Sequence, residues 1–98
     1  MTIQKPATPE LVRDTLGYIP ANLTRDDWAR ILAAIKSEFP DETGFKLADT
    51  WSQSSEGYDA KATRDTWKSL KAIGGVTIGT LFFEAKARGF DLAAWHKE

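Results

Sequence analysis

Apolar residues recur at helical spacing along most of the chain, most clearly between Thr24 and Pro40. Their positions follow one another at steps that place them on one side of an α-helix. Thr24 followed by Asp27 resembles a capping box with aspartate in place of glutamate, and Pro40 cannot continue a helix. The segment therefore predicts an amphipathic helix whose buried side comprises Trp28, Ile31, Leu32, Ile35 and Phe39.

Four further helices are predicted from capping residues at their starts and from glycine or proline at their ends. The expected N-caps are Thr8, either Asp41 or Thr43, Asp59 and Thr77. The expected inward-facing residues of the first, third and fifth helices are Leu11, Val12, Leu16 and Ile19, then Phe45, Leu47, Ala48 and Trp51, then Ile78, Leu81, Phe82 and Ala85. We expect the fourth helix to run to about Leu70–Ile73 before Gly74-Gly75, and Gly89-Phe90 to end the fifth in a Schellman motif.

No stretch alternates polar and apolar residues over the length of a strand, so the pattern predicts an all-α fold. We expect a compact bundle of five or six short helices, the sixth a single turn that starts at Asp91 and carries Leu92 and Trp95. Residues 1–7 are expected to be a flexible leader, residues 8–90 the domain, and residues 91–98 a short turn or tail. The core is expected to be one contiguous cluster that contains Trp28, Ile31, Leu32, Trp51, Trp67, Leu70, Leu81 and Phe82.

Composition narrows the possible chemistry. Ninety-eight residues suit one domain, and the absence of cysteine excludes disulfides and thiolate metal sites. The single histidine, His96, has no second imidazole to join it at a metal, and no phosphate loop or nucleophile–base set can be assembled. The paired acids Asp26-Asp27 and Asp41-Glu42 stand at helix starts, where capping and the helix dipole account for them. We therefore expect no catalytic residue, no metal and no cofactor.

Over the whole chain, charge and hydropathy indicate neither a nucleic-acid-binding protein nor a membrane protein. The net charge is −1, which gives no global case for binding to nucleic acid or to a membrane. The apolar runs are far shorter than the roughly 20 residues of a membrane helix, and no signal peptide opens the chain. A cytoplasmic setting without membrane contact is the default expectation.

The fourth helix carries a local cluster of charge. At about 100° per residue, Lys61, Arg64, Lys68 and Lys71 lie within one arc of that helix, while Trp67 and Leu70 lie on another. Just before them, the stretch WSQSSEGYD at residues 51–59 offers Ser52, Ser55 and Tyr58 as groups that could contact a phosphate or stack on a base. A plainer interpretation is also open: the cations form a solvated face, the serines satisfy backbone groups of a turn, and Trp51 and Trp67 are core residues.

Four segments occur in a specific order: Trp28 in a capped helix, WSQSSEGYD at 51–59, WKSL at 67–70 and GGVTIGTLF at 74–82. Over roughly residues 10–90 this order resembles the second type of primase C-terminal domain. That family consists of all-helical modules attached to replication primases and primase–helicases of phages, plasmids and integrated elements. The chain departs from the pattern at Leu70, where an aromatic residue is common, and in its tail at 91–98.

The resemblance implies a non-catalytic accessory role in DNA replication. A separate domain would make the primer, and this domain would help to hold the single-stranded DNA template or the initiating nucleotide. It places Trp51, Trp67 and Leu81 in the scaffold, and it makes Ser52, Ser55, Tyr58 and Lys68 candidates for contact. An alternative is a protein-docking module that couples a primase or Toprim-type domain to a helicase motor, and the near-neutral charge favours this alternative.

Overall fold

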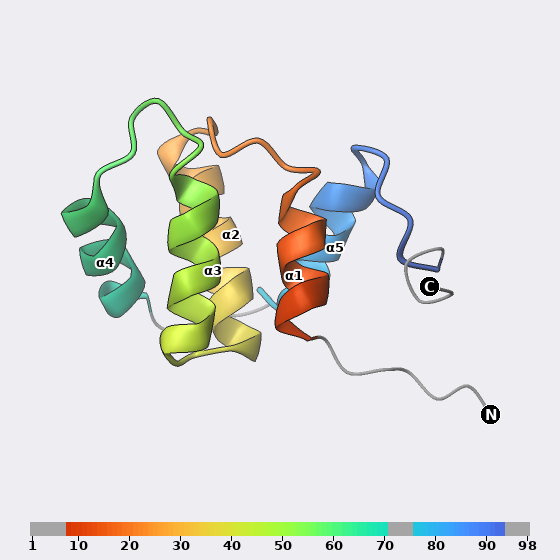
Figure 1. Ribbon diagram of the computed structural model, residues 1–98, viewed down its shortest axis with the longest axis horizontal. Helices are drawn as coiled ribbons and strands as arrows, with labels where there is room; N and C mark the ends of the chain where they lie inside the picture. The colour runs from red at the N-terminus through yellow and green to blue at the C-terminus, as the bar shows by residue number, and fades with distance from the viewer. Residues whose placement is uncertain (1–7, 71–75, 94–98) are drawn as a thin grey trace.

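The computed structural model describes residues 8–70 and 76–93 and shows an all-α fold. Its helices are α1 (Pro9–Leu16), α2 (Arg25–Glu38), α3 (Glu42–Ser52), α4 (Ala60–Ser69) and α5 (Ile78–Lys86). Helix α2 lies at the centre and packs against α3, α4 and α5, whereas α1 packs against α3 and α5. Figure 1 shows α4 and α5 at opposite ends of the bundle, with α1 and α3 side by side between them.

Each helix begins where its capping residue predicts. In each helix the side-chain oxygen of the N-cap accepts a hydrogen bond of 2.9–3.2 Å from the backbone N–H two or three residues further along the chain. The caps are Thr8, Thr24, Asp41, Asp59 and Thr77. Asp41, and not Thr43, is thus the cap of α3. The observed hydrogen bonds confirm the predicted caps. Capping can be predicted from sequence because it depends on neighbouring residues and needs no tertiary information.

The predicted helix ends are confirmed for α2 and α5 but not for α4. Helix α2 ends at Glu38, and Phe39, directly before Pro40, has left the helical region, as expected for a residue that precedes proline. Gly89 has a φ of 103°, and the Phe90 N–H donates to the Ala85 carbonyl at 3.0 Å, which confirms the Schellman motif after α5. The predicted end of α4 is wrong: the helix stops at Ser69, and Leu70 is extended.

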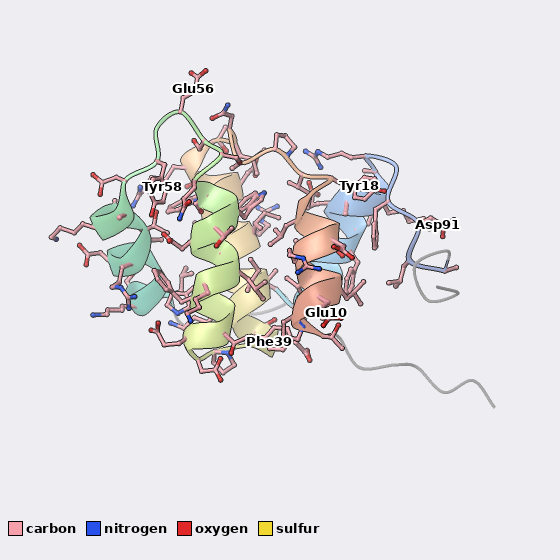
Figure 2. All side chains as sticks on the ribbon, viewed as in Figure 1. Glu10, Tyr18, Phe39, Glu56, Tyr58 and Asp91 are labelled. Atoms are coloured by element: carbon pink, nitrogen blue, oxygen red, sulfur yellow. The ribbon has the colours of Figure 1, made fainter. Side chains whose placement is uncertain are left out.

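The core is a single cluster formed by residues from all five helices. It includes most of the expected positions. The buried large side chains of the cluster are Leu11, Val12, Leu16, Ile19, Ile31, Leu32, Ile35, Phe45, Trp51, Trp67, Leu81 and Phe90. Trp28, Leu70 and Phe82 pack against this cluster but are only partly buried, because they lie at its edges. Figure 2 shows the side chains on the ribbon, with Tyr18 beside α5 and Tyr58 beside α4.

The turn between α2 and α3 is tight enough to require a glycine. A Cβ atom on Gly44 would overlap the carbonyl oxygen of Phe39, so α3 can start close to the end of α2 only with glycine at this position.

Some predictions lie outside the described residues. These concern the leader at 1–7, Lys71, the Gly74-Gly75 pair, Trp95 and His96. Residues 92–93 have helical geometry, and the remainder of the expected sixth helix falls in this group.

Candidate functional site

The end of α3 is held in place by two indole hydrogen bonds. The Trp51 Nε1–H donates to the Ile19 carbonyl at 2.8 Å, and the Trp28 Nε1–H donates to Ser52 Oγ at 2.9 Å. Ser52 is 2% exposed. The prediction that Ser52 is an exposed contact is therefore wrong, because the packing of α2 against α3 turns its hydroxyl inward to satisfy the indole of Trp28.

The loop after α3 is fixed by polar contacts to neighbouring segments. Ser55 Oγ donates to Asn22 Oδ1 at 2.9 Å, and the Glu56 N–H donates to the same oxygen at 3.1 Å. The Tyr58 hydroxyl donates to Asp49 Oδ1 at 2.7 Å. This hydrogen bond, followed by partial burial, raises the pKa of the Tyr58 phenol above its usual value, so the phenol stays protonated and keeps its bond at neutral pH. The role of Asn22 had no signal in the sequence, because it depends on contact between two loops.

A hollow of about 250 Å³ lies where this loop meets the starts of α2 and α4. It brings together three of the predicted contact residues, Ser52, Ser55 and Tyr58, although the buried Ser52 hydroxyl is used by Trp28. Arg25 and the Trp28 ring, which were not predicted as contacts, also line it. The lining also includes Asp59, the cap of α4. The hollow thus combines aromatic surface, hydroxyl groups and one guanidinium group with a carboxylate.

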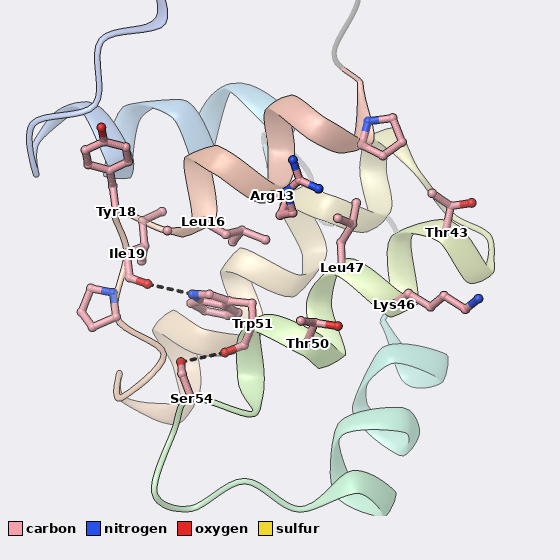
Figure 3. Close-up of a pocket in the computed structure, with 13 residues that line it drawn as sticks. Arg13, Leu16, Tyr18, Ile19, Thr43, Lys46, Leu47, Thr50, Trp51 and Ser54 are labelled. Atoms are coloured by element: carbon pink, nitrogen blue, oxygen red, sulfur yellow. Dashed lines mark hydrogen bonds between the residues drawn. The ribbon is translucent and has the colours of Figure 1, made fainter. Parts of the chain in front are cut away.

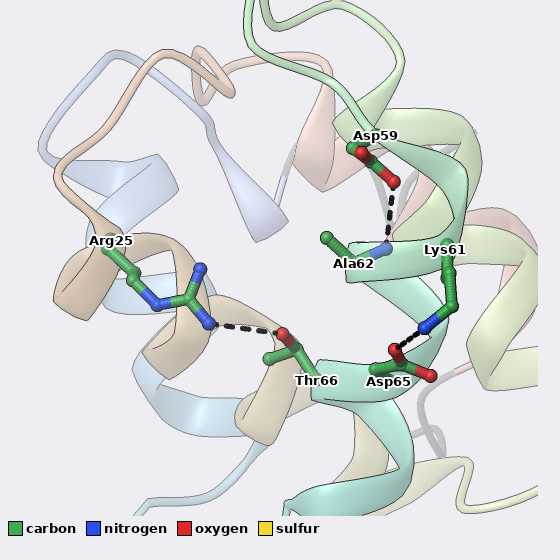
Figure 4. Close-up of polar contacts among 6 residues, drawn as sticks. All are labelled: Arg25, Asp59, Lys61, Ala62, Asp65 and Thr66. Atoms are coloured by element: carbon green, nitrogen blue, oxygen red, sulfur yellow. Dashed lines mark hydrogen bonds and ion pairs between the residues drawn. The ribbon is translucent and has the colours of Figure 1, made fainter.

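The basic stripe of α4 consists, among the described residues, of Lys61, Arg64 and Lys68, and two of these three cations form ion pairs. Lys61 Nζ lies 2.7 Å from Asp65 Oδ2 (Figure 4), and Arg64 Nη1 lies 3.2 Å from Glu42 Oε1 of α3. The hydrogen bond between Lys61 and Asp65 is the main reason that the pKa of Lys61 is raised and that of Asp65 is lowered. Lys68 is exposed and forms no hydrogen bond or ion pair with the rest of the described chain. The stripe is therefore less positive than its sequence suggests.

Two further cations flank α4 from α2. Arg25 Nη2 lies 3.5 Å from Thr66 Oγ1, as Figure 4 shows. Lys36 Nζ donates to the carbonyls of Trp67 and Leu70 at 2.6 and 2.9 Å, and it lies 5.5 Å from the Trp67 ring centroid. The ammonium group thus satisfies two carbonyls at the C-terminus of α4, a contact between helices that α4's own sequence does not show.

A second, larger hollow lies between α1 and α3. This α1–α3 groove has a volume of about 810 Å³, and Figure 3 shows its lining. Its apolar part includes Leu16, Ile19, Leu47 and Trp51. Arg13 and Lys46 also line it. The sequence placed Leu16, Leu47 and Trp51 on inward faces but could not show that their two helices leave a groove.

The chain was compared with known proteins by sequence and by structure. The family model for primase C terminal 2 (PriCT-2) matches residues 12–85. The chain belongs to the PriCT-2 family. No curated protein and no solved structure gives a match.

The PriCT-2 match covers both sites. It includes the loop after α3, all of α4 and the part of α1 from Val12 onward, so the hollow beside α4 and the α1–α3 groove lie mainly within the family region. The resemblance seen in the sequence is confirmed, and the chain is a primase-associated domain.

The part of the chain that the structure describes contains neither a cluster of metal-binding side chains nor a membrane-spanning helix. Residues 8–70 and 76–93 bring together no group of three or more His, Cys, Asp or Glu side chains that could hold a metal ion. None of the described helices combines the length and apolar character that a membrane span requires.

Proposed function

We propose that this PriCT-2 domain is a non-catalytic accessory part of a primase polypeptide and that it contacts single-stranded template or nucleotide weakly through the α4 side. The observation that carries this proposal is the hollow in which Tyr58, Ser55 and Arg25 meet, next to the exposed cations of α4. Hydroxyls and guanidinium groups position phosphates, and aromatic surface accepts bases, so this combination suits a single strand.

The ion pairs of α4 make the contact weak without preventing it. Both pairs are exposed, since the side chains of Lys61 and Asp65 are 86% and 60% accessible. Exposed pairs of this kind contribute only about 0–1 kcal/mol, so a phosphate can replace the carboxylate of Asp65 or Glu42 at little cost. Three described cations, Lys61, Arg64 and Lys68, could then neutralise phosphates, with Lys71 as a fourth from the sequence prediction.

This proposal is tested by fluorescence anisotropy with a short labelled oligothymidine at several salt concentrations. We expect weak binding with a log–log salt slope of about −2 to −3, at roughly −0.7 for each phosphate neutralised. Lys68→Ala should make the slope shallower by about 0.7 without altering the fold. Asp65→Asn and Glu42→Gln should each tighten binding, because each frees a cation from its competing carboxylate.

A matched control separates a local effect from net charge. Glu10→Gln in α1 changes the net charge by the same amount as Asp65→Asn but lies in a different helix. If Glu10→Gln tightens binding as much as Asp65→Asn, the α4 side is not the contact. Absence of any binding by the wild type at low salt would also reject the proposal.

The second candidate function is docking of a neighbouring protein domain, such as a primase or helicase domain. It is favoured by the α1–α3 groove, which is larger than the hollow beside α4 and mainly apolar. Apolar grooves between two helices commonly accept a segment of a protein partner.

A further inference from the structure

The apolar part of the α1–α3 groove offers few free hydrogen-bonding groups to a ligand, and the hydroxyls of Thr43 and Thr50 belong to the α3 side of its lining. The Trp51 Nε1–H is used by the Ile19 carbonyl, and the Ser54 hydroxyl donates to the Trp51 carbonyl at 2.8 Å (Figure 3). Beside these groups lie Leu16 and Leu47. A nucleobase needs partners for its polar edges, and burying it without them is unfavourable. The apolar part of the groove is therefore suited to aliphatic or aromatic side chains.

The charges of the groove have one sign. Arg13 from α1 and Lys46 from α3 both line it, and no acidic residue is among the described residues of its lining. Arg13 lies 3.5 Å from Asp14, but that pair is exposed, with the Arg13 side chain 68% accessible, and can exchange for another carboxylate. Lys46 is exposed. An occupant with carboxylates beside an apolar face would therefore be complementary in charge.

From these observations we infer that the α1–α3 groove binds an acidic amphipathic helix of a protein partner. Apolar side chains of that helix pack between α1 and α3, and glutamates or aspartates at its edge meet Arg13 and Lys46. Helices α1 and α3 lie side by side (Figure 1), which is the geometry in which a third helix packs its ridge of side chains into a groove. The inference rests on the docking function as the domain's second role and does not depend on the α4 side.

The probe is a labelled synthetic peptide of about 18 residues, long enough to form a helix that extends past α3 at 1.5 Å per residue. It carries leucines on one face and glutamates along both edges of that face. Its twin has lysine in place of every glutamate. We expect the wild-type domain to bind the glutamate peptide at least about tenfold more tightly than the lysine twin, since two rim cations attract the first and repel the second.

Charge exchange within the domain gives the decisive arm. The double variant Arg13→Glu/Lys46→Glu should reverse the preference and bind the lysine twin better. The variant Arg13→Gln/Lys46→Gln avoids new like-charge contacts and should remove the preference. It provides the test if the charge-reversed variant does not fold. The control Arg30→Glu/Lys86→Glu changes one arginine and one lysine outside the groove and should keep the wild-type preference.

The remaining outcomes are also informative. Equal binding of both peptides would retain docking but overturn the acidic partner. Binding of neither peptide would overturn the inference, while the oligonucleotide titration with Asp65→Asn reports on the α4 side separately. If neither peptide binds but ATP shifts the amide resonances of Leu47 and Thr50, the groove binds a nucleotide and not a protein, which overturns the inference.

Discussion

The hydrogen bond from Trp28 to Ser52 joins the first turn of α2 to the last turn of α3. Trp28 is partly buried and its indole N–H requires an acceptor, which the Ser52 hydroxyl supplies; Ser52 itself is 2% exposed. Ser55, only three residues later, lies at the surface and bonds Asn22. Two serines in the same short stretch thus have different roles, and only their neighbours in space distinguish them.

Replacement of these serines should separate the two roles. Ser52→Ala removes the acceptor of the partly buried Trp28 N–H and should lower the free energy of unfolding by about 1–3 kcal/mol. Ser55→Ala should cost less than about 0.5 kcal/mol, because water can replace its contact at the surface. Urea denaturation of both variants measures the difference. Equal costs would show that the Trp28–Ser52 bond does not stabilise the domain.

At the scale of helices, the sequence predicts what depends on neighbouring residues and misses what depends on distant ones. Thr24 and Asp59 cap their own helices, so their roles could be predicted. The end of α4 could not be, because the group that satisfies its carbonyls is Lys36 of α2. The same reason explains the candidate site. The shared arc of Lys61 and Arg64 followed from helical spacing, whereas the carboxylate of Glu42 in α3 that pairs with Arg64 did not.

Lys36 should therefore act as a cap supplied by another helix. Lys36→Met keeps most of the aliphatic chain but removes the bonds to the carbonyls of Trp67 and Leu70. We expect it to lower the free energy of unfolding by about 1–2 kcal/mol, the usual size for hydrogen bonds to a charged group that also complements the helix dipole.

The matched control is Lys46→Met in α3, an exposed lysine, which should change stability by no more than about 0.5 kcal/mol. Thermal unfolding followed by circular dichroism compares the two variants. A Lys36→Met variant as stable as Lys46→Met would show that the bonds from Lys36 to the end of α4 do not stabilise the domain.

On the scale of the whole molecule, Trp67 is the one large side chain that α4 buries in the core. Trp67 is 5% exposed, and its ring meets Phe45 edge-on with centroids 6.0 Å apart while Lys36 lies over it. Helix α4 packs against α2 and α3, and it carries both Lys61 and Lys68 of the proposed contact. The packing of Trp67 thus decides whether that surface is held rigidly on the bundle.

Trp67→Ala should destabilise the entire domain and not α4 alone. Loss of the buried ring is expected to cost about 3–5 kcal/mol, a large part of the roughly 5–15 kcal/mol that stabilises a typical domain. Because Trp67 belongs to the same cluster as Leu32 and Leu81, far-ultraviolet circular dichroism and tryptophan fluorescence should give one common, lowered urea midpoint. Phe83→Ala, at a ring that is 70% exposed, is the control and should leave the midpoint nearly unchanged. A fluorescence midpoint that differs from the dichroism midpoint would instead show α4 unfolding as a separate unit, and the α4 surface would then be a movable element attached to a four-helix core.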